Sequence, residues 1–387
     1  MNRKAIVTVV TRNYLHFALA LADSARRHHD DVDIYVCLAD RPPVDLASLN
    51  EDVTFFFADE LEIPQWRRFC FQYTPFELSC SLKPFAVQHV LAKGYEEVIY
   101  LDSDMRIYGR LDEVFAALSQ HSIVLTPHLL KPFPEDDKLP GEKLFLMAGT
   151  YNGGFFAVRN DDNSNQFIAW WRARMMSDGH KDLTGSIFTD QKWLSLVPGL
   201  FDNVMLLRNP GYNTGHWTFP QFALTTDSDG QPLIGGRPIV LFHFSNFNPS
   251  TPEEFNRCQT RFTLDSLPPL IPMVAEYHAV VAAKNELQCD DWGCAFTQVN
   301  DGSQIHPGWR EAIRRNDPFF EGVEDPFDVQ SDPQILAKFR AIEGNSHKWR
   351  NDWRLNPALV FPTPSSRPMK HRFKSFLHKI GLRKKVA

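Results

Sequence analysis

The stretch "EEVIYLDSD", Glu96 to Asp104, carries the pattern that decides the fold. An apolar run of strand type ends on two aspartates, Asp102 and Asp104. If the strand belongs to a parallel sheet, both lie at its carboxyl edge, where ligands bind in open α/β folds. Residues two apart share one side of an extended chain, so both carboxylates can face one ion. Because hard oxygen ligands suit Mg²⁺ and Mn²⁺, the stretch predicts a divalent-cation site.

Two other stretches have the same Asp-x-Asp spelling. Asp227 to Asp229 is followed by Gly230, and an Asp-Gly pair ahead of a strand predicts a tight turn. Asp31 to Asp33 follows the polar turn "RRHHDD" and leads into a strand. Both contexts favour a structural role, so context rather than spelling distinguishes Asp102 and Asp104.

Further strand-like runs, rich in β-branched and aromatic residues, lie on both sides of this stretch. They are "AIVTVVT", "VDIYVCLAD", "VTFFFAD", "SIVLTPH", "NGGFFAVR", "NVMLLRN" and "PIVLFHFS". Helical patterns lie between several of them, including "NYLHFALALADSARRHH" with Asn13 as N-cap, and "SLKPFAVQHVLAKG", which stops at Gly94. Strands alternating with helices predict an α/β fold with a mainly parallel, doubly wound sheet flanked by helices.

The chain changes character near residue 265, where "LPPLIP" breaks the alternation. Helical patterns, Trp-containing loops and a basic end follow. We therefore expect two parts: an α/β domain over 1–264 that carries the site, and a mostly helical extension over 265–387.

Composition excludes several classes of protein. With 387 residues, 43% of them hydrophobic, the chain can bury a sizeable core. A net charge of −6 argues against a nucleic-acid partner. The six scattered cysteines form no metal-ligand pattern and indicate reduced thiols in a cytoplasmic protein. No apolar run is long enough to predict a membrane span.

The absence of early glycines is informative, because the first glycine of the chain is Gly94. Dinucleotide folds and P-loops both need glycines after the first strand to bring backbone amides against phosphates. Any nucleotide bound by this sheet must have its phosphates neutralised by other means, and a metal ion is the natural candidate.

Six stretches, in order, resemble motifs of GT-A-fold glycosyltransferases. They are similar to those of the glycogenin-like (family eight) glycosyltransferases and of glycosyltransferases from bacterial surface-polysaccharide gene clusters. The stretches are "VTVVTRNY", "SLKPF", "YLDSD", "YNGGFFAV", "TDQKWL" and "LFHFSNF". The resemblance covers residues 5 to about 262 and implies a GT-A type fold with a nucleotide-sugar-binding catalytic domain over 1–264.

The resemblance implies roles for individual residues. Thr11, Asn13 and Tyr14 would hold the donor nucleoside. His243 would complete the metal site of Asp102 and Asp104, a ligand set that favours Mn²⁺ over Mg²⁺. Further donor contacts are implied for Lys83, Asp102, Ser103, Asn152, Gly153 and Gly154, and handling of the donor sugar for Asp190 and Gln191.

The chain departs from the resemblance after His243. The family follows this histidine with Gly and then Lys-Pro-Trp, whose Lys contacts the diphosphate. Here Asn246 replaces the Gly and no such Lys follows. Arg257 or Arg261 could supply the charge, since arginine binds phosphate bidentately, and Arg261 is the preferred candidate.

Structural alternatives remain open for several of these residues. Asp190 is also a routine helix cap, and Asn152 with its two glycines fits a bulge. Lys83 before Pro84 fits the first turn of a helix. Trp217 can form a platform for a sugar ring or simply pack in the core.

The implied reaction is a metal-dependent transfer of a hexose from a nucleotide diphosphate sugar, UDP-linked by preference, to a glycan or lipid-linked acceptor in surface-polysaccharide synthesis. The resemblance implies retention of anomeric configuration and no nucleophile is nominated; an inverting enzyme would use Asp190 as base. The alternatives are a sugar nucleotidyltransferase, which would carry a Gly-rich basic loop after the first strand, and a non-catalytic carbohydrate-binding module.

The C-terminal tail adds a possible membrane contact. From Arg367 onward it holds eight Lys or Arg and no acidic residue. Phe373, Phe376, Leu377 and Ile380 recur at helical spacing. This pattern is typical of a short amphipathic helix on an anionic bilayer, and equally of a solvated tail. It predicts a cytoplasmic protein that can associate peripherally with the membrane.

Overall fold

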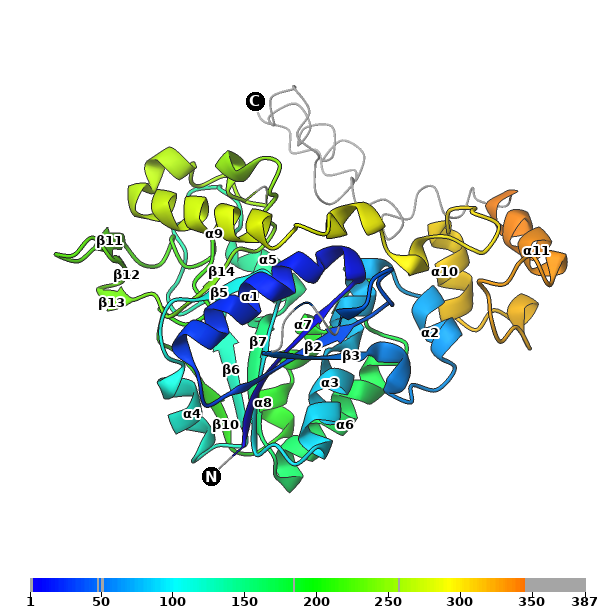
Figure 1. The fold of residues 1–387 in the computed structure, drawn as a ribbon, viewed down its shortest axis with the longest axis horizontal. Helices are drawn as coiled ribbons and strands as arrows, with labels where there is room; N and C mark the ends of the chain where they lie inside the picture. Colours follow the sequence, from blue (N-terminus) through cyan, green and yellow to red (C-terminus); the bar gives the residue numbers. More distant parts are fainter. Residues whose placement is uncertain (1–2, 47–48, 50–51, 184, 257, 345–387) are drawn as a thin grey trace, which may run out of the picture. The chain divides into compact units, whose positions relative to one another are not determined.

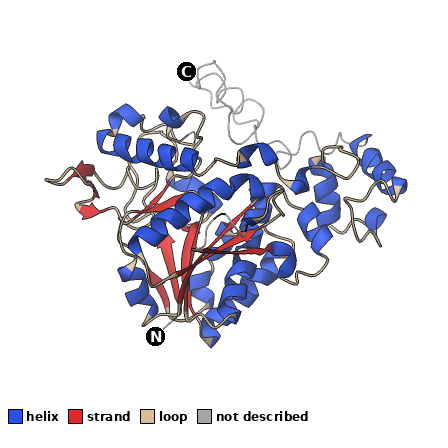
Figure 2. Cartoon of the chain, viewed as in Figure 1, coloured by secondary structure: helices blue, strands red, loops and turns tan. Residues whose placement is uncertain are grey.

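Seven strands form the central sheet of the computed structural model, which describes residues 3–46, 49, 52–183, 185–256 and 258–344 (Figure 1). In spatial order they are β10 (Val204–Leu206), β6 (Ile123–Pro127), β7 (Tyr151–Arg159), β4 (Glu97–Leu101), β1 (Lys4–Val10), β2 (Asp33–Leu38) and β3 (Val53–Phe57). Only β7 runs against its neighbours; the other pairings are parallel. The predicted α/β fold with a mainly parallel sheet is confirmed, with helices on both faces (Figure 2).

One face of the sheet is covered by α1 (Leu15–His28) and α4 (Asp112–Leu118). Alternate strand residues point to this face because side chains alternate along a strand. They join the apolar side of α1 in one buried cluster: Ile6, Val10, Ile34, Val36, Ile99, Leu101, Leu15, Ala18, Leu19 and Ala22. The helix follows β1 through a single 3-10 turn, Arg12–Tyr14. Asn13 is therefore not the N-cap that the sequence suggested; its side chain accepts a hydrogen bond from Thr11 instead.

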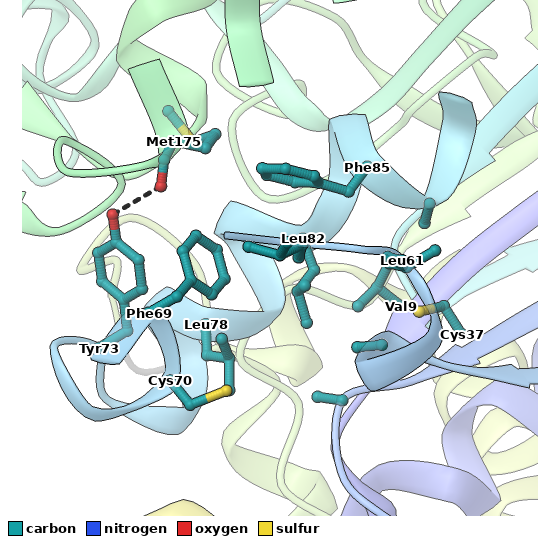
Figure 3. Packing of buried hydrophobic residues seen from close by; sticks show 14 of the residues in the cluster. Val9, Cys37, Leu61, Phe69, Cys70, Tyr73, Leu78, Leu82, Phe85 and Met175 are labelled. Carbon is teal, nitrogen blue, oxygen red and sulfur yellow. Dashed lines mark hydrogen bonds between the residues drawn. The ribbon is translucent and has the colours of Figure 1, made fainter. Parts of the chain in front are cut away.

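The opposite face is covered by α3 (Pro75–Ala92) and α6 (Asp162–Met175). Figure 3 shows part of this core, including Phe85 and Leu82 of α3 and the hydrogen bond from the Tyr73 hydroxyl to the Met175 carbonyl, 2.7 Å. Helix α3 begins earlier than the sequence suggested, because Thr74 and Glu77 form a capping box ahead of the predicted start. Lys83 consequently lies deep inside α3 rather than in its first turn.

Among the described residues, short strands form three smaller sheets, separate from the central sheet. β5 (Met105–Ile107) pairs antiparallel with β14 (Leu241–His243), which places His243 opposite Met105. β8 (Lys181–Asp182) pairs with β9 (Ile187–Phe188). β11 (Leu224–Thr226), β12 (Pro232–Ile234) and β13 (Arg237–Pro238) form a separate antiparallel sheet. The remaining helices of this part are α2 (Trp66–Phe71), α5 (Glu142–Ala148), α7 (Gln191–Leu194) and α8 (Val197–Leu200).

Beyond residue 264 the described chain is mostly helical. Its α-helices are α9 (Ile271–Ala283), α10 (Pro307–Arg314) and α11 (Pro333–Gly344). Phe339 of α11 stacks on Phe71 with ring centroids 5.2 Å apart, and Arg310 donates to the Phe71 carbonyl, 2.9 Å. This part thus shares apolar core with the α/β part, and a domain boundary near 265 stays a prediction. The predicted basic tail falls outside the described residues.

Two further expectations concern cysteines and membranes. All six cysteines are free, as expected. Within the described ranges, no helix combines the length and apolar character that crossing a bilayer requires.

Candidate metal and donor site

Asp102, Asp104 and His243 come together at the carboxyl edge of β4. Each offers one ligand atom, and these atoms lie within 4.8 Å of one another. His243 Nε2 is 3.1 Å from an Asp104 carboxylate oxygen. Burial opposes the charged form of Asp104, but the neighbouring imidazole lowers its pKa. Two carboxylates and an imidazole fit the preferences of Mn²⁺ and Mg²⁺.

The β5–β14 pairing explains how residues so distant in sequence meet. Asp104 immediately precedes β5, and its carbonyl accepts the Phe244 amide, 2.8 Å. The antiparallel ladder places His243 opposite Met105. The register of two three-residue strands therefore determines the separation between the imidazole and the carboxylates.

A contact on the ring nitrogen that faces away from Asp104 orients His243. Its Nδ1 lies 3.2 Å from Asn213 Oδ1, and Asn213 Nδ2 donates to Thr126 Oγ1, 2.7 Å. With Asn213 Oδ1 accepting, a proton on Nδ1 is favoured, and Nε2 faces Asp104 as the nitrogen that could bind a metal. Asn213 has φ +56°, a left-handed conformation that asparagine tolerates.

Gly154 leaves the space between the ligands open. A Cβ on this residue would lie 2.5 Å from His243 Cε1 and 2.7 Å from Asp102 Oδ2. The other oxygen, Asp102 Oδ1, is already used, since it accepts from the Tyr100 hydroxyl at 2.8 Å. Asp102 Oδ2 thus faces His243 across a gap that only glycine permits, so the space between these two possible ligands stays open.

Lys83 connects the metal cluster to Asp190. Its buried ammonium lies 3.0 Å from Asp102 Oδ1 and 3.1 Å from Asp190 Oδ2, and it donates to the Gly153 carbonyl, 3.0 Å. Burial lowers the pKa of Lys83, but the two carboxylates outweigh burial, so the net pKa is raised. Burial raises the pKa of Asp190 although Lys83 is close. The pairing brings a positive charge beside the predicted metal site, where a diphosphate would also lie.

The glycine strand β7 is anchored by side chains on both sides. Gln191 Oε1 accepts the Gly153 amide, 3.0 Å, and Asn152 Oδ1 accepts the Gly154 amide, 2.9 Å. Asn152 Nδ2 bonds His128 Nε2, 3.0 Å. Asp190 is the N-cap residue of α7 but makes no side-chain capping bond. The cap alternative for Asp190 is therefore not supported, because its carboxylate pairs with Lys83.

The predicted donor turn directly follows β1, the strand that pairs with β4. Thr11 is buried and donates to Asn13 Oδ1, 2.7 Å. Tyr14 is 50% exposed and stacks on Phe17 with centroids 5.3 Å apart. Partial burial and, less strongly, the charge of Asp104 raise the pKa of the Tyr14 phenol.

Other predicted residues take different positions. Arg261 pairs with Asp136 and donates to the carbonyls of Lys138 and Pro140, so its guanidinium holds the 136–140 loop. Its diphosphate role stays a prediction, while Arg257 lies outside the described residues. Ser103 is partly buried between the two aspartates. Trp217 is only 4% exposed and packs edge-on against His243, 5.3 Å between centroids, so it serves as core.

The structure adds residues that the sequence analysis missed. Asn213, Tyr100 and His128 all touch predicted site residues through buried hydrogen bonds. Tyr100 lies inside the quoted stretch, two residues before Asp102, so the spacing itself was a signal. Asn213 and His128 belong to loops with no motif, and nothing in the sequence singles them out.

Comparison with known proteins gives two kinds of likeness, and no family model matches the chain. Two uncharacterised proteins of Bacillus subtilis (strain 168) are similar in sequence. YfnD is 26% identical over 257 residues, covering 65% of this chain and 80% of YfnD. YfnF is 25% identical over 256 residues, covering 63% of this chain and 81% of YfnF.

Solved structures of glycosyltransferases are similar in outline. The galactosyltransferase LgtC, in complex with donor and acceptor sugar analogues, has a TM-score of 0.44 at 15% identity over 72% of this chain and 95% of its own. The bifunctional glycosyltransferase WbbM has a TM-score of 0.45 at 17% identity, covering 73% of this chain and 52% of WbbM. The glycosyltransferase GlyE of Streptococcus pneumoniae has a TM-score of 0.43 at 15% identity, covering 77% of this chain and 67% of GlyE. Likeness at this level says nothing of activity, which has to be judged from the residues of this chain.

Proposed function

We propose that this protein is a metal-dependent glycosyltransferase that moves a hexose from a nucleotide diphosphate sugar, UDP-linked by preference, to a glycan or lipid-linked acceptor. The observation that carries the proposal is the Asp102, Asp104 and His243 cluster at the carboxyl edge of the sheet. The motif resemblance agrees with it.

In this proposal three atoms hold the ion: Asp102 Oδ2, an Asp104 carboxylate oxygen and His243 Nε2. Mn²⁺ is preferred and Mg²⁺ is the alternative. A bound ion supplies Lewis-acid stabilisation of the charge that grows on the leaving diphosphate. Asn213 orients His243 so that Nε2 faces the proposed ion, and Tyr100 and Lys83 orient Asp102 from its other oxygen.

Lys83 also supplies positive charge near the diphosphate. It stays protonated because two carboxylates raise its pKa. Because its ammonium already pairs with Asp102 and Asp190, Lys83 does not replace the missing Lys after His243, a role for which Arg261 remains the proposed candidate. Asp190 and Gln191 border the same space through their contacts with Lys83 and Gly153, and they are proposed to handle the donor sugar.

The proposed stereochemical outcome is retention, with no protein nucleophile assigned. Asp190 is buried and paired with Lys83, so an attacking role would require that ion pair to open. An inverting reaction would use Asp190 as general base. Product analysis of the anomeric configuration separates the two outcomes.

The test is a panel of nucleotide sugars incubated with the protein and Mn²⁺, scored for slow donor hydrolysis without acceptor. Hydrolysis of one donor that stops with EDTA and returns with Mn²⁺ supports the proposal. Binding of UDP without any hydrolysis or transfer would indicate a non-catalytic module. Release of pyrophosphate from a nucleoside triphosphate and a sugar phosphate would indicate a nucleotidyltransferase.

A peripheral membrane contact through the basic tail is proposed on sequence alone. The eight basic residues from Arg367 onward would add on the order of 1 kcal/mol each near an anionic surface. The full chain should sediment with anionic liposomes, less so at high salt, and truncation after Ser366 should abolish this. Equal sedimentation of both forms would show that the tail is no anchor.

A further inference from the structure

Three segments far apart in sequence meet at the end of β1. They are the predicted donor turn Thr11–Tyr14, the residues after β2 around Asp40, and a loop of the extension, residues 292–295. Asp40 lies between them, and both of its carboxylate oxygens accept backbone amides. Asp40 Oδ1 accepts from Arg12, 2.7 Å, and Asp40 Oδ2 accepts from Ala295, 2.8 Å.

The side chain of Arg12 completes the junction. It donates to the carbonyls of Trp292, 2.9 Å, and Gly293, 3.1 Å, and its Nε is 3.4 Å from Asp40 Oδ2. A planar guanidinium holds its donors in a fixed fork, whereas the three donors of a lysine ammonium rotate freely on a flexible stem. Asp40 is only 1% exposed by side chain, so water competes little for the bonds that its carboxylate accepts, while Arg12 is 24% exposed.

Arg12 is itself the second residue of the donor turn. Two hydrogen bonds of Thr11 span Arg12. The Thr11 carbonyl accepts the Tyr14 amide, 2.8 Å, and the Thr11 hydroxyl donates to Asn13 Oδ1, 2.7 Å. The conformation of the turn therefore depends on where the Arg12 backbone is held. Asp40 holds the backbone amide, and the extension holds the side chain.

We infer that residues 292–295 of the extension, acting through Arg12 and Asp40, keep the donor turn in its binding conformation. The extension is then a working part of the donor site rather than an appendage, and Arg12 and Asp40 are positioning residues. This inference rests on the proposed use of Thr11, Asn13 and Tyr14 for the donor nucleoside.

A second arginine provides a matched control. Arg67 also reaches the extension, with Nε 2.8 Å from Asp325 and its guanidinium over the Phe327 ring. Arg67 belongs to α2, and the extension residues that it contacts are not the ones that Arg12 contacts. Replacing Arg67 therefore removes an arginine link to the extension without touching the turn.

The experiment compares Arg12→Met, Asp40→Asn and Arg67→Met in the full-length protein. Calorimetry with UDP and Mn²⁺ should show affinity reduced on the order of tenfold for the first two variants, as expected when the binding conformation is populated about a tenth of the time. Arg67→Met should bind UDP like the wild type. The KM for the donor should rise in Arg12→Met while kcat changes little, and Mn²⁺ binding without nucleotide should be unchanged.

Hydrogen exchange of residues 11–14 in the nucleotide-free protein supplies a readout independent of the donor. It should be faster in Arg12→Met than in Arg67→Met. Wild-type UDP affinity and exchange in Arg12→Met would overturn the inference, as would equal losses in Arg12→Met and Arg67→Met. If the wild-type protein binds no UDP, the proposed function fails, and the exchange rates alone decide whether the extension holds the turn.

Discussion

The "DSD" at Asp102–Asp104 and the "DSD" at Asp227–Asp229 have the same letters and opposite surroundings. The first ends a buried central strand, and its carboxylates meet Lys83 and His243. The second forms an exposed turn between β11 and β12, where Asp227 Oδ1 accepts the amides of Asp229, 2.9 Å, and Gln231, 2.8 Å. In the turn, the Asp227 carboxylate accepts hydrogen bonds from nearby backbone amides. At the end of the strand, the Asp102 and Asp104 carboxylates face side chains from other parts of the chain instead. The tight turn predicted for Asp227–Asp229 is confirmed.

The largest contrast should come from matched Asp→Asn substitutions. Asp104→Asn removes a charge from the metal cluster and should reduce donor turnover about a thousandfold or more, since Lewis-acid stabilisation amounts to several kcal/mol. Asp229→Asn should change neither activity nor melting temperature, because asparagine fits turns equally well. Assays of donor hydrolysis with Mn²⁺ measure both. Full activity of Asp104→Asn with the metal chelated would remove the basis for the proposed site.

Adding a methyl group in each region tests the same contrast sterically. In Gly154→Ala the new Cβ would lie 2.5 Å from His243 and 2.7 Å from Asp102 Oδ2, so activity and Mn²⁺ affinity should both fall by about a hundredfold. In Gly230→Ala the Cβ meets nothing within 4 Å, but φ is +78°. The cost there is backbone strain of about 1 kcal/mol in the free energy of unfolding, with activity intact. Mn²⁺ titration and urea unfolding of both variants distinguish crowding from strain. Wild-type Mn²⁺ affinity in Gly154→Ala would mean that the cluster does not close around an ion.

The sequence alone predicted the sheet and the three metal-site candidates, because these depend on local patterns and on a motif resemblance. It did not predict how the candidates are supported. Asn213 reaches His243 because its neighbour Thr214 bridges to Phe242 of β14, and such long-range pairing leaves no trace in either segment. The early start of α3 had a readable signal in Thr74 and Glu77 that the Lys-Pro pair at Lys83 obscured.

Asn213 should have a smaller but measurable effect on the metal site. Asn213→Gly keeps a residue that tolerates φ +56° and removes only the side chain that orients His243. Mn²⁺ affinity should fall ten- to a hundredfold, the usual range for a lost partner of a metal-binding histidine. Asn203→Gly is the control, because Asn203 has φ +51° and is an exposed residue directly before β10, at the end of the sheet opposite its carboxyl edge. Equal Mn²⁺ affinity in the two variants would show that Asn213 acts only on the backbone.

The smallest expected effect concerns pH, and it again separates the buried region from the exposed turn. Behind the metal cluster, burial lowers the pKa of His128 and of His216 to about 3. Above pH 6.5 both histidines are neutral whether the chain is folded or not, so stability is at its full value. As pH falls below 6.5, these histidines are protonated in the unfolded chain but not in the folded chain. Each should lower the free energy of unfolding by on the order of 1 kcal/mol per pH unit until about pH 3.

Urea unfolding at pH 7.5 and 5.5 measures this loss of stability, and His216→Asn should reduce the difference between the two free energies of unfolding. The control Asp227→Asn lies in the exposed turn and should leave that difference unchanged. A His216→Asn protein with the pH dependence of the wild type would mean that this imidazole is protonated inside the fold.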